Sequence, residues 1–197
     1  MKQIFLGIII SGLLMSCAKE NPYLIAKNKL GPLDNSTKIH EVEGLLVNDS
    51  VVVENPQTPF GTFIKSVVKT MEVYDNTGTK HLIIQPRGAL DTISQIKSIR
   101  LVSDRYKTEN GIGFGSSFGE LKKYHDVSNI QSSLQSIIIT LNDINAFVSF
   151  DREVLPSDVR FDIEAEITPI MIPDDATINR FWLNFDAERK GEAVESK

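Results

Sequence analysis

A serine between two glycines is the first feature of this sequence that could do chemistry. Residues 115–119 read Gly-Ser-Ser-Phe-Gly, which fits the G-x-S-x-G pattern of a nucleophilic serine on a sharp turn. Serine hydrolysis also needs a histidine base and an acidic partner later in the chain. The one histidine after Ser117 is His125, about 12 Å further along the same predicted helix. We therefore expect Ser117 to cap that helix, and we predict no catalytic residues.

Three glycines that lead into this segment, the last of them its first residue, could suggest a loop that binds phosphate groups. A dinucleotide site needs such glycines directly between a strand and a helix of a parallel βαβ unit. Here residues 105–110 separate Gly111, Gly113 and Gly115 from the preceding strand, and the predicted sheet is antiparallel. We interpret the glycines as turn residues and expect no nucleotide or other cofactor.

The residues that could ligate a metal ion have simpler structural explanations. Carboxylates are calcium ligands, but the acidic residues of 158–166 alternate with apolar ones, which is typical of a strand with one solvated face. The histidines are far apart in the sequence, so we predict no metal site. The residues considered are Asp158, Asp162, Glu164, Glu166, His40, His81 and His125.

Cys17 is the only cysteine, and it follows a segment typical of an export signal. Lys2 precedes an apolar run over residues 4–15, and the small residue Ser16 stands before the cysteine. The run is about 12 residues long, whereas a helix that spans a bilayer needs roughly 20. The pattern therefore predicts a signal peptide over residues 1–16 rather than a transmembrane helix.

Residues 14–17, Leu-Met-Ser-Cys, resemble the lipobox of bacterial lipoproteins. The resemblance implies cleavage before Cys17 and attachment of diacylglycerol to its sulfur, and two or more acyl chains anchor a protein stably to a membrane. In this family an aspartate directly after the cysteine commonly retains the protein at the inner membrane, and none follows Cys17. The implied location is the outer membrane, facing the periplasm or the cell surface. An acylated Cys17 leaves no thiol for disulfides, catalysis or metal binding.

The composition is that of an ordinary globular domain, with 24% charged and 41% hydrophobic residues. The net charge of −5 gives no basic surface for nucleic acid. The length suits one domain or two small ones. The expected partners are the membrane, through Cys17, and a protein of the envelope.

The chain after the signal divides into two halves that repeat at an offset of 82 residues. We predict a lipidated tether over 17–29, a first unit over 30–110, a second unit over 111–186 and a polar tail over 187–197. The matched pairs are Gly31 with Gly113, Ile39 with Leu121, Ile96 with Ile178 and Asp104 with Asp186.

Each half begins with a short amphipathic helix, with Asn35 and Ser117 suited to the two N-caps. Four strands follow each helix. The predicted fold class is therefore α+β, with two tandem repeats of a short helix plus a four-stranded antiparallel sheet. The strands are predicted at 50–54, 62–75, 80–85 and 96–104, and at 136–141, 145–151, 160–167 and 178–186.

This arrangement, together with the turn-helix segment over 113–121, resembles the small outer-membrane assembly lipoproteins of the small-protein-A type and the tandem beta-lactamase inhibitory protein. Neither relative is an enzyme, so the resemblance implies a non-catalytic binding or assembly module. Two alternatives stay open, an envelope hydrolase with an unrecognised site and a purely structural lipoprotein.

Trp182 and Arg100 form the predicted binding surface. Phe181 and Phe185 are expected to point inward, and successive side chains of a strand point to opposite faces, so Trp182 faces outward. Arg100 is its equivalent at offset 82 and should point the same way. Tryptophan and arginine are over-represented among binding hot spots. The alternative is that the tether or the other half covers Trp182.

Overall fold

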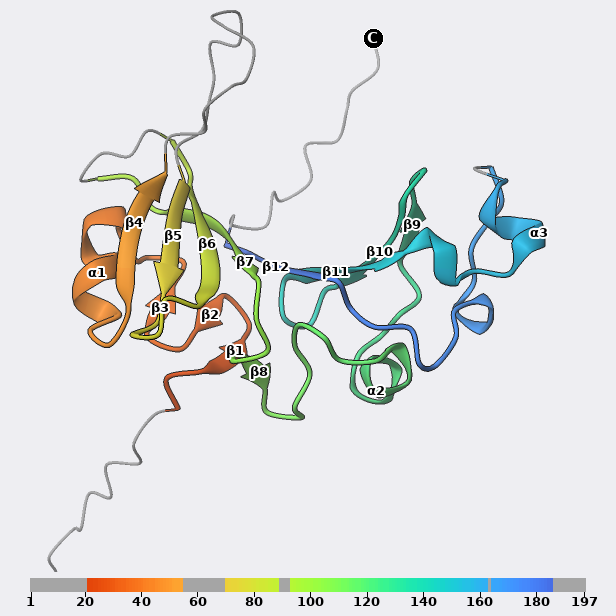
Figure 1. The fold of residues 1–197 in the computed structure, drawn as a ribbon, viewed down its shortest axis with the longest axis horizontal. Coiled ribbons are helices and arrows are strands. Elements are labelled where there is room, and N and C mark those ends of the chain that lie inside the picture. Colours follow the sequence, from red (N-terminus) through yellow and green to blue (C-terminus); the bar gives the residue numbers. More distant parts are fainter. Residues whose placement is uncertain (1–20, 55–69, 89–92, 163, 186–197) are drawn as a thin grey trace, which may run out of the picture.

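The fold comes from a computed structural model that describes residues 21–54, 70–88, 93–162 and 164–185 (Figure 1). Cys17, the predicted signal over 1–16 and the predicted tail over 187–197 lie outside these residues. Within the described part of the chain, no helix is long and apolar enough to cross a membrane.

The protein has a mixed α+β fold, as predicted, and it is built mainly from sheets. The larger sheet has eight strands in the order β4-β5-β6-β7-β12-β11-β10-β9, and every neighbouring pair is antiparallel. The pair β7 and β12 joins strands from the two halves of the sequence into one continuous sheet. The strands are β4 (Ser50–Glu54), β5 (Thr70–Tyr74), β6 (Lys80–Pro86), β7 (Ile96–Leu101), β9 (Ile130–Ser132), β10 (Ser136–Leu141), β11 (Ala146–Asp151) and β12 (Arg180–Asn184).

A smaller sheet and several short helices complete the fold. The smaller sheet has the order β3-β2-β1-β8, and its β1–β8 pair is parallel. These strands are β1 (Leu24–Ala26), β2 (Lys29–Leu30), β3 (Leu33–Asp34) and β8 (Lys107–Thr108). The α-helices are α1 (Val42–Leu45), α2 (Phe118–Tyr124) and α3 (Ser157–Arg160), and the 3-10 helices are η1 (Ile39–Glu41), η2 (Arg152–Val154) and η3 (Pro169–Met171).

One face of the large sheet forms the core with the helices and the small sheet. Phe181, Leu183 and Phe185 are fully buried, as their alternation predicted. Phe118 of α2 packs edge-on against Phe150 of β11, with ring centroids 5.7 Å apart. Burial of these apolar side chains is the main stabilising contribution, and it leaves the opposite face of the sheet uncovered by α1 and α2.

The strand predicted over 160–167 is wrong, since α3 and irregular chain occupy this region. Arg152, only 3% exposed, donates from Nε to the Arg160 carbonyl at 2.7 Å and from Nη2 to the Val159 and Asp162 carbonyls at 3.0 and 2.5 Å. These carbonyls bond to a guanidinium and not to a strand ladder. The edge strand of this half is β9, which the sequence analysis did not predict.

The first half begins earlier and differs at its helix from the prediction. Strand β1 lies within residues 17–29, which we expected to be tether, and β2 begins at the last of these residues. The N-cap of η1 is Lys38 rather than Asn35, and the Glu41 carboxylate accepts the Lys38 backbone N–H at 2.9 Å. Ile39 and Phe118 each follow an N-cap, so the match of Ile39 with Leu121 at offset 82 does not hold here.

Candidate functional site

A row of residues crosses the uncovered face of the large sheet, each opposite the next on a neighbouring strand. Their sequence neighbours in the central strands, such as Leu101 and Phe181, are buried on the core face. The alternation of side chains along a strand therefore places the row on the outer face. From β4 to β10 the row is Val52, Glu72, Ile83, Arg100, Trp182, Phe147 and Thr140.

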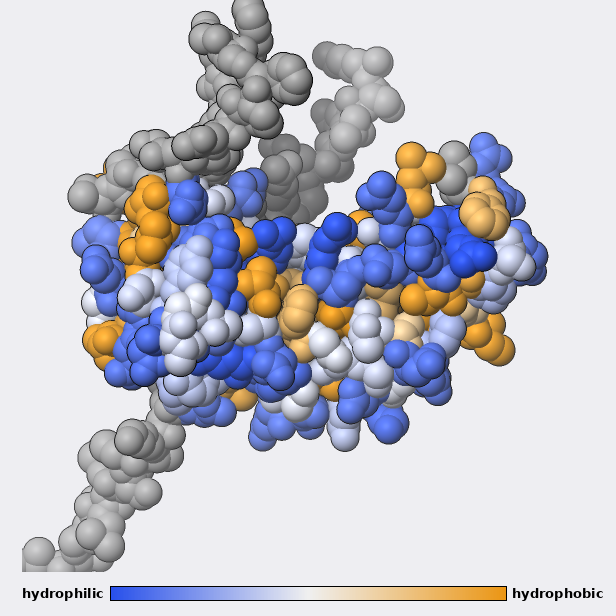
Figure 2. Space-filling view, viewed as in Figure 1, coloured by the Kyte–Doolittle hydropathy of each residue, from blue (hydrophilic) through white to orange (hydrophobic). Residues whose placement is uncertain are grey.

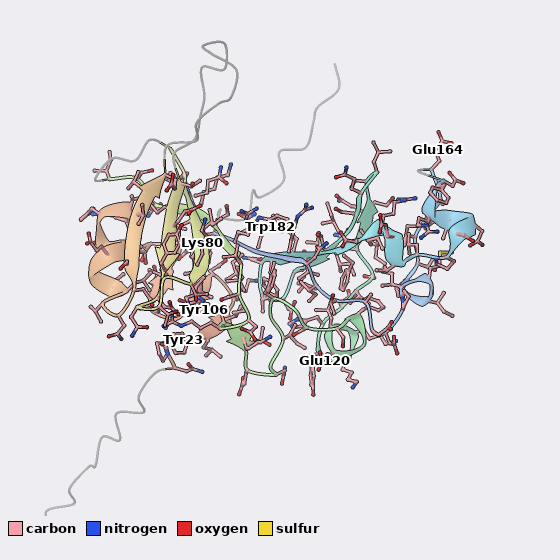
Figure 3. All side chains as sticks on the ribbon, in the orientation of Figure 1. Tyr23, Lys80, Tyr106, Glu120, Glu164 and Trp182 are labelled. Carbon is pink, nitrogen blue, oxygen red and sulfur yellow. The ribbon has the colours of Figure 1, made fainter. Side chains whose placement is uncertain are left out.

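The structure brings the two predicted binding residues together at the centre of this row. Arg100 and Trp182 are direct cross-strand partners of β7 and β12, and both are half-buried. Figure 3 shows Trp182 on the side of the sheet opposite Tyr106 and Glu120. The ring of Phe147 lies beside the indole, with centroids 5.2 Å apart. Trp182 therefore belongs to an aromatic platform on the outer face.

The guanidinium of Arg100 makes no hydrogen bond to any residue that the structure describes, and its Nε atom is buried without a partner. Glu72, two strands away, is held by other groups: it pairs with Lys80 and accepts the Tyr74 hydroxyl at 2.5 Å. Burial alone would raise the pKa of Glu72, but the hydrogen bonds to Lys80 and Tyr74, with the charges of Lys80 and Arg100, hold it below its ordinary value. An arginine fork without a partner is suited to a carboxylate.

A pocket of about 320 Å³ opens beside Arg100. Ser98 donates its hydroxyl to Gln85 Oε1 at 3.2 Å, and no described residue accepts from the Gln85 amide nitrogen. The pocket therefore offers a guanidinium, a free amide donor and an apolar wall, which together suit an anionic group attached to an apolar body. Its lining residues are Thr70, Glu72, Ile83, Gln85, Ser98, Arg100 and Trp182.

Ser117 caps α2, as predicted. Its Oγ accepts the Glu120 backbone N–H at 3.2 Å, and the Glu120 carboxylate accepts the Ser117 N–H at 2.9 Å. These contacts with Ser117 lower the pKa of Glu120. His125 bonds elsewhere, since its Nδ1 lies 2.7 Å from Asp143 Oδ2. The structure therefore does not join Ser117 to a histidine base.

Replacing Ser117 with alanine should lower the free energy of unfolding by about 0.5–2 kcal/mol, because the first turn of α2 loses its side-chain acceptor. Chemical denaturation followed by the fluorescence of Trp182 measures this difference. Ser157→Ala is the matched control, since Ser157 is exposed at the start of α3 and its side chain caps nothing. Equal stabilities of the two variants would contradict the capping role.

The other candidate motifs have structural roles or remain scattered. A Cβ at Gly113 would lie 2.3 Å from the Tyr106 carbonyl oxygen, and Gly115 has φ +78°, so this loop requires glycine. Asp162 accepts the Glu164 backbone N–H at 3.0 Å within a turn. The described residues contain no group of three histidine, cysteine or acidic side chains that could hold a metal ion.

The structure also shows a Ser-His-Asp array that the sequence analysis missed. His81 Nδ1 lies 2.5 Å from Ser103 Oγ, and His81 Nε2 lies 3.0 Å from Asp75 Oδ2. His81 is the extra residue of a β-bulge, because Leu82 pairs with Val73 whereas Lys80 pairs with Tyr74. A bulge redirects a side chain, and its position could not be read from the alternating pattern.

This array links the β5–β6 turn to the end of β7. Asp75 Oδ1 accepts the Thr77 hydroxyl at 2.7 Å and the backbone N–H groups of Thr77 and Thr79 at 2.8 and 2.9 Å. The hydrogen bond from the Thr77 hydroxyl, followed by those to His81 and to the backbone, holds the pKa of Asp75 well below its ordinary value. Asp75 and His81 line a surface pocket, but Ser103 does not. The described geometry thus favours a structural role for the array.

Comparisons with known proteins support the fold and no function. The chain matches no known family and no curated protein. It is similar to the crystal structure of the uncharacterized protein yfeY from Escherichia coli, with 14% identity and a TM-score of 0.50. The similarity covers 82% of this chain and 99% of that one. At this level of identity the two proteins share a fold.

Proposed function

We propose that this protein is a lipid-anchored lipoprotein of the outer membrane, and that it binds an envelope protein through the outer face of its large sheet without catalysing a reaction. The observation that carries the proposal is the guanidinium of Arg100, which has no hydrogen-bond partner among the described residues and lies beside Trp182 and an open pocket. A buried polar atom such as Nε of Arg100 is costly unless a hydrogen-bond partner satisfies it, and a bound ligand could supply that partner. The lipobox-like segment before Cys17 supports the anchor.

We further propose that the sheet arose from two tandem helix-plus-sheet repeats. The order of strands is mirrored about the β7–β12 pair, and each set of four strands follows a helix in the sequence. Arg100 and Trp182 are separated by the offset of 82 and are also cross-strand partners. A local two-fold axis relating two such repeats would pass between these two residues. The binding surface then lies at the junction of the repeats.

The chemistry of the surface suggests the partner's contact group. Arg100 suits a carboxylate, while Trp182, Phe147 and Ile83 offer apolar area for the neighbouring side chain. The amide nitrogen of Gln85 can donate to a peptide carbonyl. We propose that the partner presents an acidic residue next to an aromatic or aliphatic one.

A titration with small peptides tests this surface, because Trp182 is the only tryptophan and reports binding directly. N-acetyl-aspartyl-phenylalanine amide should change its fluorescence at lower concentration than the asparaginyl analogue. Arg100→Gln should weaken binding of the aspartyl peptide by about 30-fold, equivalent to about 2 kcal/mol.

Arg180→Gln is the control, since Arg180 lies on β12, the strand of Trp182, but is exposed and already donates to Ser136 Oγ at 3.2 Å. It should leave the affinity within about twofold, as expected for a peripheral charge. Equal binding of the two peptides, or equal effects of the two substitutions, would contradict the proposal that Arg100 binds a carboxylate.

The second candidate is an envelope hydrolase, and the Ser103–His81–Asp75 array is the specific observation that favours it. A fluorophosphonate probe labels activated serines covalently. Our account predicts no labelling of the folded protein. Labelling that is lost in Ser103→Ala and kept in Ser117→Ala would establish the hydrolase instead.

A further inference from the structure

The described chain begins close to the proposed lipid anchor. Asn21 is four residues after Cys17, and four extended residues span at most about 14 Å. The chain is fixed from this point: the Asn21 carbonyl accepts the Leu24 N–H at 3.3 Å, and the Tyr23 carbonyl accepts the Lys107 N–H at 3.1 Å. The surface around Asn21 therefore cannot move far from a lipid attached to Cys17.

An apolar surface lies at this point of the fold. A pocket of about 200 Å³ is lined by Asn21, Pro22 and Tyr23 from the start of the described chain and by residues 45–49 at the end of α1 and just after it. Leu45 is 40% exposed and Val47 is 77% exposed. Figure 2 shows hydrophobic side chains at the end of the molecule formed by α1 and β4. We call Pro22, Tyr23, Leu45 and Val47 the anchor-side patch.

The two charged residues that line this pocket, Asp49 and Arg105, are paired with each other. Arg105 donates to Asp49 Oδ1 at 2.8 Å and to the Tyr23 hydroxyl at 2.6 Å, and its guanidinium lies 4.3 Å from the centre of the Tyr23 ring. Hydrogen bonding to Tyr23 and Asp49 offsets the burial of Arg105 and raises its pKa. A tyrosine with a bonded hydroxyl and an apolar ring suits the boundary between membrane and water.

We infer that the anchor-side patch rests on the lipid bilayer that holds the acyl chains of Cys17. This inference rests on the lipidation of Cys17 proposed above. A bilayer is the favoured occupant because a chain of about 14 Å leaves no room for a folded protein between the patch and the membrane. Tyr23 and Tyr106 lie on the side of the large sheet opposite Trp182 (Figure 3), so this orientation leaves the Arg100–Trp182 face open to a partner.

A single-label experiment on the lipidated protein tests the inference. The natural cysteine is acylated, so Val47→Cys introduces the one reactive thiol, to which the environment-sensitive dye NBD is attached. The protein is reconstituted in phosphatidylethanolamine and phosphatidylglycerol vesicles that contain phosphatidylcholine with brominated acyl chains. Leu134→Cys is the matched control, because Leu134 is 75% exposed in the β9–β10 turn at the other end of the sheet.

The dye at position 47 should emit at shorter wavelength and lose at least half of its fluorescence to the brominated lipid, and the dye at position 134 should show neither effect. Flotation of the protein with the vesicles but equal quenching at the two positions would overturn the membrane contact and leave the anchor intact. Failure of the protein to float with the vesicles would overturn both the anchor and this inference.

Discussion

Replacing Arg152 with alanine is expected to lower the free energy of unfolding by about 2–4 kcal/mol, a large effect for a polar side chain. Arg152 is buried and holds four backbone carbonyls and the Ser132 hydroxyl. Alanine leaves these carbonyls to water and releases the segment that follows η2. Urea denaturation measures the loss, and proteolysis should cut within residues 157–171.

The expected result for Arg152→Lys separates charge from geometry. Lysine keeps the positive charge but lacks the planar fork that reaches several carbonyls at once, so it should recover only a minor part of the lost stability. Arg180→Ala, which removes an exposed arginine from β12, should change the stability by no more than about 0.5 kcal/mol. If Arg152→Ala lowered the free energy of unfolding no more than Arg180→Ala, the proposed role of Arg152 in holding the backbone carbonyls would be contradicted.

Replacing Cys17 with alanine is expected to remove the protein from the membrane fraction. The sulfur is the predicted attachment point of the acyl chains, and each buried methylene contributes about 0.8 kcal/mol to membrane binding. Loss of the chains should therefore lower the membrane-bound fraction more than tenfold and abolish incorporation of labelled palmitate.

Ser16→Ala is the matched control for the anchor, because it keeps a small residue before the cysteine. It should leave both the sedimentation and the labelling unchanged. A Cys17→Ala protein that still sediments with membranes and still incorporates palmitate would show that the lipoprotein interpretation is wrong.

The sequence was most informative where burial imposes a simple period. The strand predicted over 136–141 has those same bounds in the structure, and the inward positions of Phe181 and Phe185 are confirmed. The strand predicted over 50–54 also has the same bounds, although it is an exposed edge strand. One buried face forces alternate residues to be apolar, and this signal depends on no distant contact. The same rule placed Trp182 on the outer face.

The failures arose where a distant side chain decides the local structure. Residues 160–167 alternate like a strand, but the guanidinium of Arg152 takes the carbonyls that a strand would need. The bulge at His81 depends on pairing with β5. Pairing register is a tertiary property, so local periodicity alone could not predict either feature.

The candidate site was predictable only in part for the same reason. Arg100 and Trp182 could be singled out by residue type and by the offset of 82, whereas Ile83 and Phe147 could join them only once the strand register was known. That Arg100 finds no hydrogen-bond partner in the described part of the chain is likewise a property of the folded sheet.

Photo-crosslinking from Ile83 in intact cells tests the central claim most directly, because Ile83 lines the pocket beside Arg100 and Trp182. A photoreactive phenylalanine at position 83 of the anchored protein should give one crosslinked species of defined mass. Arg100→Gln should abolish that species and Arg180→Gln should keep it. No adduct from position 83, or the same adducts when the photoreactive group is moved to position 134, would contradict binding through this face.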